Sequence, residues 1–297
     1  MKRPAALLSL LALSPFAALA AQSAAPTANP PVIAPAAWEN PLKQLLRDGK
    51  TVVGMTVTIN NADVVLQAAR LGFDFVWIEM EHSPVTLESV RHMVLATQGT
   101  HLIPLVRVPV NEIWTAKRAL DTGALGVIFP FTSTPELARQ AVDACRYPPV
   151  GRRGAGPGLA SQRWPAPQGY SDFADKNVLV IIIIEEKRAV ENIDAILDVP
   201  GIDVVFVGPN DLSYSYGDRG RQTPQVVAAI AKVLAAARKR GIPAGRTAGT
   251  GDIKGHVQQG FQLFQASSEL GFISAGARLF LEAAGKNPPD LKNRPLY

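Results

Sequence analysis

Apolar and polar positions repeat along the chain as short strand-like runs followed by longer helix-like segments. The strand-like runs are rich in β-branched and aromatic residues and cover residues 51–59, 73–81, 101–109, 126–131, 178–186, 201–211 with the following loop, 242–248 and 261–267. Apolar residues spaced by three and four predict helices over residues 62–72, 87–98, 111–122, 134–145, 189–197, 224–240, 252–259 and 270–284. Eight strand–helix units in this order favour a (β/α)8 TIM barrel over a doubly wound open sheet.

The most apolar run, residues 178–184, is purely aliphatic and is followed at once by Glu185 and Glu186. Such a run is typical of a strand buried on both faces of a parallel sheet, and it is too short to span a bilayer. Burying a charge is costly unless it is paired or bound to a metal. The two acids therefore indicate either a solvated strand end or half of a cation site at the carboxyl ends of the strands, where barrels carry their active sites.

The first residues are predicted to lie outside the fold. Lys2 and Arg3 precede an apolar run at residues 5–13, and Ala18-Leu19-Ala20 is a small-x-small cleavage site, which together indicate a signal peptide. A retained membrane anchor is the alternative, but the apolar run is short, and we expect an exported, periplasmic protein. The predicted boundaries are residues 1–20 for the signal peptide, 21–37 for a flexible Ala/Pro-rich leader, 38–287 for the barrel and 288–297 for a tail.

Composition narrows the classes of partner. The formal net charge of +5 is modest and the basic residues form no runs, so we expect no nucleic-acid partner. After cleavage of the signal peptide we expect no stable membrane insertion. Cys145 is the only cysteine, which excludes an intrachain disulfide and favours a buried, inert thiol.

Polar residues gather where the predicted strands end. The second strand ends in Glu79, Glu81 and His82, and the third ends in Arg107. The fifth ends in Glu185 and the sixth leads into Asn210 and Asp211. Each of these residues taken alone is more simply a solvated charge, a helix cap or a structural ion pair. Because a barrel brings the carboxyl ends of its strands to one face, the set together predicts a site.

These residue types suggest metal-assisted chemistry. Two carboxylates from adjacent strands are hard oxygen ligands suited to Mg²⁺ or Mn²⁺. Arg107 could then stabilise a developing oxyanion, and His82 could move a proton. The glycine-rich stretch 151–158 has no Walker lysine–serine pair and is a weak nucleotide loop, but its amides could approach a carboxylate.

Four segments carry a resemblance to a known family. They are FDFVWIEMEHSP (73–84), PLVRVPVNEIWTAKRALDTGALGVIFPF (104–131), RYPPVGRRGAGPG (146–158) and IIEEKRAVENIDAILDVPGIDVVFVGPNDLS (183–213). On these segments the chain resembles the HpcH/HpaI aldolases, which are metal-dependent class II pyruvate aldolases of the 4-hydroxy-2-oxoheptanedioate aldolase type. The similarity extends over residues 40–284.

The resemblance implies a barrel whose last helix is exchanged between subunits of a homo-oligomer, a trimer or a hexamer. It implies a divalent cation (Mg²⁺, Mn²⁺ or Co²⁺) held by Glu185 and Asp211. It further implies that Arg107 contacts the carbonyl and enolate oxygen of pyruvate, and that His82 takes part in proton transfer.

Three further residues gain roles only through the resemblance. Asp121, in the helix after the third strand, matches an aspartate that supports the histidine. The pyruvate carboxylate is expected on backbone amides near Gly156 in the glycine-rich loop and near Asn210 and Asp211.

The chain departs from the family pattern on the side of the aldehyde. The family usually has D-G-E-H where this chain has Glu79-Met80-Glu81-His82. A frequent glutamine is replaced by Ile183, a common tryptophan of the first strand is absent near Thr56, and Pro157 replaces a serine. The roles of Glu79 and Glu81 and the choice of substrate are thus open. An export signal is also unusual for such aldolases.

We therefore expect a carbon–carbon lyase that cleaves a 4-hydroxy-2-oxo acid to pyruvate and an aldehyde through a metal-stabilised enolate. One alternative is an exported, non-catalytic binder of small 2-oxo acids in which proton transfer is lost. Another is a lyase acting on a related oxo acid or CoA ester. A Schiff-base aldolase would need a lysine near the site, for which Lys187 is the nearest candidate in sequence.

Overall fold

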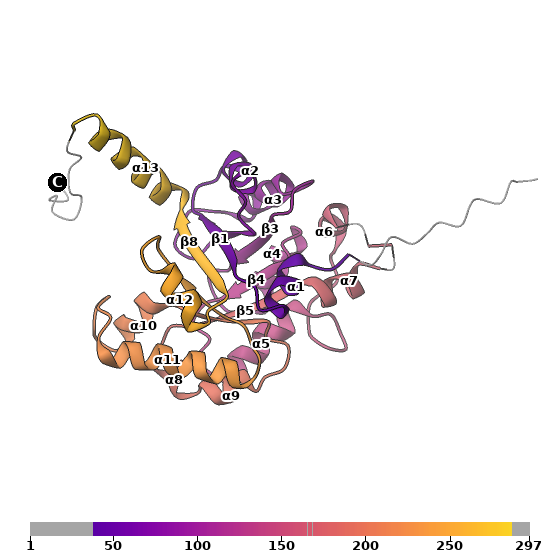
Figure 1. The fold of residues 1–297 in the computed structure, drawn as a ribbon. Coiled ribbons are helices and arrows are strands. Elements are labelled where there is room, and N and C mark those ends of the chain that lie inside the picture. Colours follow the sequence, from indigo (N-terminus) through magenta and orange to yellow (C-terminus); the bar gives the residue numbers. More distant parts are fainter. Residues whose placement is uncertain (1–37, 165, 168, 287–297) are drawn as a thin grey trace, which may run out of the picture. The chain divides into compact units, whose positions relative to one another are not determined.

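A computed structural model describes residues 38–164, 166–167 and 169–286. The predicted signal peptide, leader and C-terminal tail lie outside the described residues. Within the described part, eight parallel strands form one closed barrel in chain order (Figure 1). The strands are β1 (Val52–Val57), β2 (Phe75–Glu79), β3 (Ile103–Arg107), β4 (Gly126–Phe129), β5 (Leu179–Ile184), β6 (Val204–Val207), β7 (Ala244–Thr247) and β8 (Leu263–Ser268). The predicted (β/α)8 barrel is confirmed.

Helices alternate with the strands in the order that the apolar spacing predicts. They are α1 (Pro41–Arg47), α2 (Ala62–Leu71), α3 (Leu87–Ala96), α4 (Ile113–Asp121), α5 (Pro135–Cys145), α6 (Gly158–Arg163), α7 (Tyr170–Asn177), α8 (Lys187–Glu191), α9 (Ile193–Leu197), α10 (Pro209–Ser215), α11 (Pro224–Lys239), α12 (Ile253–Gln259) and α13 (Glu269–Ala283).

The barrel interior is filled by side chains from alternate strand positions. Phe75 and Trp77 on β2 face inward, and a Cβ at Gly54 on β1 would lie 2.0 Å from a carbon of the Phe75 ring. The Trp77 ring packs against Phe206 of β6 with centroids 4.9 Å apart. All three aromatic side chains are buried, so aromatic rings facing small residues occupy the interior below the mouth.

Several helices differ from the prediction. The stretch 146–176 was expected to be irregular, but it contains α6 and most of α7, because its glycines and prolines lie mainly outside these helices. The helix over 189–197 is divided at Asn192 into α8 and α9. Pro209 stands at the first position of α10, where the backbone N–H has no partner within the helix and its absence costs nothing. The segment expected as a loop after β6 therefore begins a helix.

Two further positions test the sequence interpretation. Glu112, not Asn111, is the N-cap of α4, while the Asn111 amide donates to Thr132 Oγ1 and Leu137 O. Cys145 is buried as expected, and burial raises the pKa of its thiol to about 12. Among the helices of the described residues, none has both the length and the apolarity needed to cross a membrane.

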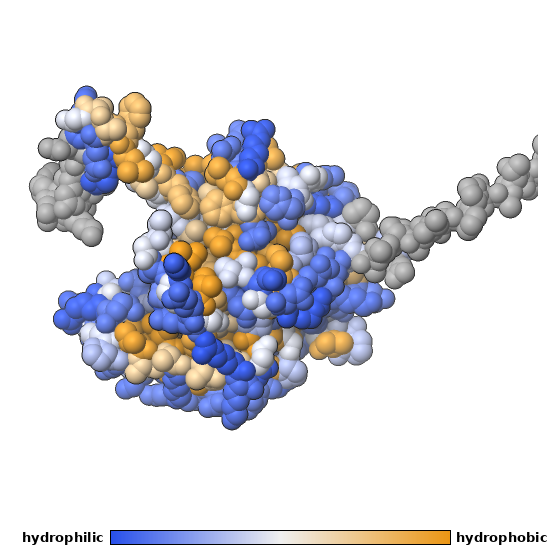
Figure 2. Space-filling model, viewed as in Figure 1, coloured by the Kyte–Doolittle hydropathy of each residue, from blue (hydrophilic) through white to orange (hydrophobic). Residues whose placement is uncertain are grey.

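The last helix does not cover its own barrel. Figure 1 shows α13 leaving β8 and extending away from the strands. Glu269 is its only buried residue, and this carboxylate accepts hydrogen bonds from the backbone N–H and the hydroxyl of Thr58. Apolar side chains stand exposed along the helix (Figure 2), namely Leu270, Phe272, Ile273, Leu279 and Phe280. Whether a partner subunit exchanges this helix stays a prediction.

Candidate functional site

Glu79, the last residue of β2, organises the mouth of the barrel. Its carboxylate is 2% exposed and accepts hydrogen bonds from Trp77 Nε1 at 3.1 Å, Arg107 Nε at 2.6 Å, and the backbone N–H groups of Glu81 and His82 at 2.7 and 2.9 Å. A buried carboxylate needs such donors, because it has lost its water. One side chain thus fixes the catalytic arginine candidate and the turn that carries His82.

Arg107, the last residue of β3, lies between two carboxylates. Its Nε contacts Glu79 and its Nη1 lies 2.9 Å from Glu81 Oε2. The guanidinium also lies over the Trp77 ring, 5.7 Å from the centroid. Since both acids are almost fully buried, these two contacts hold the planar guanidinium in one orientation.

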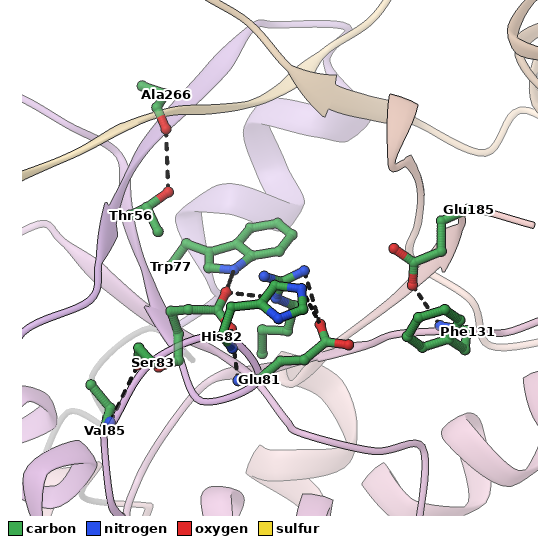
Figure 3. A network of polar contacts seen from close by, with 11 residues as sticks. Thr56, Trp77, Glu81, His82, Ser83, Val85, Phe131, Glu185 and Ala266 are labelled. Carbon is green, nitrogen blue, oxygen red and sulfur yellow. Dashed lines mark hydrogen bonds and ion pairs between the residues drawn. The ribbon is translucent and has the colours of Figure 1, made fainter. Parts of the chain in front are cut away.

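His82 lies beside this pair and is open to solvent. Its side chain is 62% exposed, and its Nε2 lies 3.8 Å from Glu81 Oε2. Figure 3 shows His82 and Glu81 next to each other beside the Trp77 ring, with Glu185 across from them. The imidazole is therefore free to meet a substrate oxygen that enters the mouth.

Glu185, directly after β5, is the second buried carboxylate. It is 2% exposed, and its Oε1 accepts the backbone N–H of Phe131 at 2.7 Å (Figure 3). Phe131 adopts a left-handed φ of 49°, an unfavourable conformation for an aromatic residue that directs this N–H at the acid. Burial raises the pKa of Glu185 to about 7, and the nearby charges of Glu81 and Asp211 act in the same direction.

A glycine leaves room for the Glu185 carboxylate where the chain passes from β6 into the helix that carries Asp211. A Cβ at Gly208 would lie 2.9 Å from Glu185 Oε2, so a side chain there would displace the carboxylate. Gly208 is the N-cap of α10, and Asp211 lies in the first turn of that helix.

Burial also raises the pKa of Glu81, and both Asp211 and Glu79 oppose its ionisation electrostatically.

This donor set fits a cation. Carboxylates from Glu81, Glu185 and Asp211 repel one another at the mouth, and buried like charges are relieved by a divalent ion. In the part of the chain that the structure describes, no group of three or more His, Cys, Asp or Glu side chains is arranged to hold a metal. Glu185 and Asp211 alone suit Mg²⁺ or Mn²⁺, which use one or two carboxylates and leave positions for water or substrate.

Two predicted site residues are not brought to this mouth within one chain. Asp121 ends α4, and helices of a barrel run back from the carboxyl ends of the strands, so it lies at the opposite end. Its Oδ1 pairs with Arg153 at 3.0 Å, and Gly156 lies against its Oδ2. The predicted support of His82 by Asp121, and a carboxylate contact at Gly156, are therefore not formed by this chain alone.

The structure also shows where the other residues singled out in the sequence lie. Asn210 and Asp211 both lie in the first turn of α10, with the Asn210 side chain exposed. Glu186 turns away from Glu185 and accepts a hydrogen bond from Ser133 Oγ. Lys187 is exposed and lies 4.0 Å from Glu191, which gives no support to a Schiff-base lysine.

Sequence reasoning missed three residues that shape the site. Trp77 was expected only as part of a strand, although its spacing of two from Glu79 already predicts that both face inward. Gly208 stands in the GPND segment that carried the resemblance, without its packing role being visible. No pattern marks Phe131, because its backbone conformation follows from the barrel around it.

Comparisons with known proteins identify the family of this chain. The model of the HpcH/HpaI aldolase/citrate lyase family matches residues 53–274. Hydroxypyruvate/pyruvate aldolase of Roseobacter denitrificans is 37% identical over 212 residues, which cover 71% of this chain and 81% of that protein. 2-Dehydro-3,6-dideoxy-6-sulfogluconate aldolase of Pseudomonas putida is 35% identical over 222 residues, which cover 74% and 87%.

A solved structure of an HpcH/HpaI aldolase/citrate lyase family protein from Burkholderia cenocepacia superposes with a TM-score of 0.78 at 32% identity. The match covers 83% of this chain and 100% of the Burkholderia chain. The family model, the sequence relatives and the solved structure therefore agree: this chain belongs to the HpcH/HpaI aldolase/citrate lyase family.

Proposed function

We propose that this protein is a class II pyruvate aldolase, which cleaves a 4-hydroxy-2-oxo acid to pyruvate and an aldehyde. The observation that carries the proposal is the Glu185 carboxylate, buried at the mouth in the electrostatic field of Glu81, Asp211 and Arg107. Family membership supports a carbon–carbon lyase. We assign a divalent cation, Mg²⁺, Mn²⁺ or Co²⁺, to Glu185 and Asp211.

Each side chain at the mouth has a separate role in the proposed reaction. When bound, the cation polarises the 2-oxo group of the substrate and favours the enolate. Arg107 directs its N–H groups at the oxygen on which negative charge develops, and Glu79 and Glu81 keep it aimed there. His82 accepts the proton of the 4-hydroxyl as the bond between C3 and C4 breaks, and exposure of its ring lets it exchange that proton with water.

A second candidate function is an exported binder of 2-oxo acids without turnover. The departure from the family pattern at Glu79 and Met80, directly before Glu81 and His82, favours it. Binding of a 2-oxo acid without proton exchange at C3 would identify this function. Export itself remains a proposal from residues 1–20 of the sequence, and the periplasm is the compartment we propose.

Replacing Arg107 by Ala should lower kcat for retro-aldol cleavage by about 10²-fold or more, because the oxyanion loses its oriented donor. The measurement is pyruvate release from a 4-hydroxy-2-oxo acid with Mn²⁺, with an EDTA blank. Arg70→Ala on the exposed face of α2 is the matched control and should retain full activity. An Arg107→Ala enzyme as fast as the unmodified protein would remove Arg107 from this role.

Cation binding should weaken as the pH falls, because a proton and the cation compete for the same Glu185 oxygens. With the pKa of Glu185 near 7, the carboxylate is mostly free at pH 8 and mostly protonated at pH 6. The Kd for Mn²⁺, measured by calorimetry, should therefore rise about tenfold between pH 8 and pH 6. Glu185→Gln should bind poorly at both values. Equal affinity of the unmodified protein at pH 6 and pH 8 would contradict the assignment.

Glu79 is a positioning residue, and its substitution should affect kcat more than KM. Glu79→Gln keeps one acceptor oxygen where the carboxylate serves four donors, so Arg107 and the His82 turn lose their fixed geometry. We expect a loss of roughly 10²-fold in kcat. Glu79→Asp restores the acid usual in the family and should recover most of this loss. Glu136→Gln, at an exposed position, serves as the control. If Glu79→Asp recovers none of the lost kcat, this result argues against a positioning role for Glu79.

We also propose that α13 packs on a second copy of this chain in a trimer or hexamer. A helix that exposes Leu279 at 69% and Phe280 at 75% needs an apolar cover. Phe280→Glu should shift the mass measured by light scattering toward the monomer, whereas Lys232→Glu on α11 should not. A monomeric unmodified protein would overturn this proposal.

A further inference from the structure

Glu186 is an acid at the end of β5 to which the proposed reaction gives no role. It follows Glu185 directly and is the N-cap of α8. In the part of the chain that the structure describes, its side chain makes no capping hydrogen bond to that helix. Its Oε2 instead accepts the hydroxyl of Ser133 at 2.5 Å. Ser133 is 3% exposed and lies in the loop after β4, residues 130–134. One hydrogen bond thus joins this loop to the residue after the proposed metal ligand.

The same loop carries the N–H group that Glu185 uses. Phe131 donates this N–H to Glu185 Oε1 at 2.7 Å, with its own φ at 49° (Figure 3). A phenylalanine does not favour that conformation, so contacts on either side of it must hold the loop in place. On the next residue, the Thr132 N–H donates to Ile183 O at 3.3 Å. Because that bond fixes only the backbone next to Phe131, the loop needs a further anchor toward α5.

Ser133 supplies this anchor through two hydrogen bonds. Its hydroxyl donates to Glu186, and its carbonyl oxygen accepts from Asn192 Nδ2 at 3.0 Å. Both partners belong to the segment that follows β5, which is also the segment that begins with Glu185. Since Ser133 lies two residues after Phe131, its contacts restrict the backbone that presents the Phe131 N–H to the carboxylate.

The Phe131 N–H determines which oxygen of Glu185 is left for a ligand. It occupies Oε1, while Oε2 lies on the side of Gly208, where a Cβ would be 2.9 Å away. Gly208 is the N-cap of α10, and Asp211 lies in the first turn of that helix. The oxygen that the protein leaves without a hydrogen bond in the described residues is therefore the one beside the helix of the second proposed ligand.

We propose that Ser133 and Glu186 are positioning residues for the cation site. Their hydrogen bond holds the Phe131 N–H on Glu185 Oε1 and thereby keeps Oε2 directed at the cation. The inference rests on the proposed function, in which Glu185 is a metal ligand, and it adds two residues that act on this ligand without touching the cation themselves.

The first test uses metal-free protein, so it does not depend on the proposed function. Hydrogen exchange of the Phe131 N–H is followed by NMR after selective ¹⁵N labelling of the 11 phenylalanines. Ser133→Ala should raise the exchange rate of this N–H by roughly threefold or more, because the loop loses one anchoring hydrogen bond. Ser171→Ala, at an exposed position of α7, is the matched control and should leave the rate unchanged. An unchanged rate in Ser133→Ala would overturn the positioning role.

The second test measures the Kd for Mn²⁺ by calorimetry. Ser133→Ala and Glu186→Ala should each raise the Kd by roughly three- to tenfold, as for the loss of one hydrogen bond. The double variant should bind no more weakly than either single variant, because both remove the same bond. Glu186→Gln keeps an acceptor oxygen and should recover most of the affinity. Glu191→Gln, an exposed acid on the same helix, is the control for loss of charge and should keep the original Kd.

The outcomes distinguish the positioning role from the cation site itself. If the unmodified protein binds Mn²⁺ and both alanine variants bind it equally well, the positioning role is overturned and the cation site remains. The same conclusion follows if Glu186→Gln recovers nothing, since the charge of Glu186 and not its hydrogen bond would then matter. Absence of Mn²⁺ binding by the unmodified protein would remove the cation assignment, and this inference with it.

Discussion

The structure depends on how buried carboxylates at one end of the barrel are compensated. Glu79 and Glu185 are each 2% exposed, and Glu81 is nearly buried between them. Arg107 and backbone N–H groups satisfy Glu79, whereas Glu185 has the single N–H of Phe131 and keeps a raised pKa of about 7. The charge left over after the protein's own donors are used is what supports our proposal that this mouth binds a cation and an anionic substrate.

The barrel beneath supplies the rigidity that this arrangement requires. The aliphatic β5 is buried along its whole length, and the inward aromatic rings of β2 and β6 fill the space below the acids. Gly208 lets the backbone after β6 pass directly against Glu185, and Asp211 follows three residues later in the first turn of α10. The unfavourable φ of Phe131 is held by these neighbours, so the packing of the core maintains the orientation of the one N–H that Glu185 uses.

Much of the fold follows from the sequence, because burial on a barrel leaves a strong periodic pattern, and β5 is the clearest case. The periodic pattern does not reveal the short helices. Of these, α6 and α7 lie among glycines and prolines, and α10 directly follows a strand. Glu185 and Glu186 are adjacent acids that the resemblance alone distinguished in the sequence, and the structure adds that Glu185 accepts the N–H of Phe131 whereas Glu186 binds Ser133. Asp121 lies at the end of α4, away from the strand ends of its own chain, so its predicted support of His82 stays a prediction that requires a second copy of the chain.

Proton exchange at the methyl group of pyruvate is the sharpest test of the proposed enolate, because it requires only enolate formation and no aldehyde. The protein beginning at Ala21 would be incubated in D₂O with pyruvate and Mn²⁺, and with EDTA in a parallel sample, and the methyl signal read by NMR after metal removal. An aldolase should lose that signal with Mn²⁺, faster than Mn²⁺ alone causes, and should keep it with EDTA. Persistence of the methyl protons in the presence of bound pyruvate would contradict it and leave a binding protein in an aldolase fold.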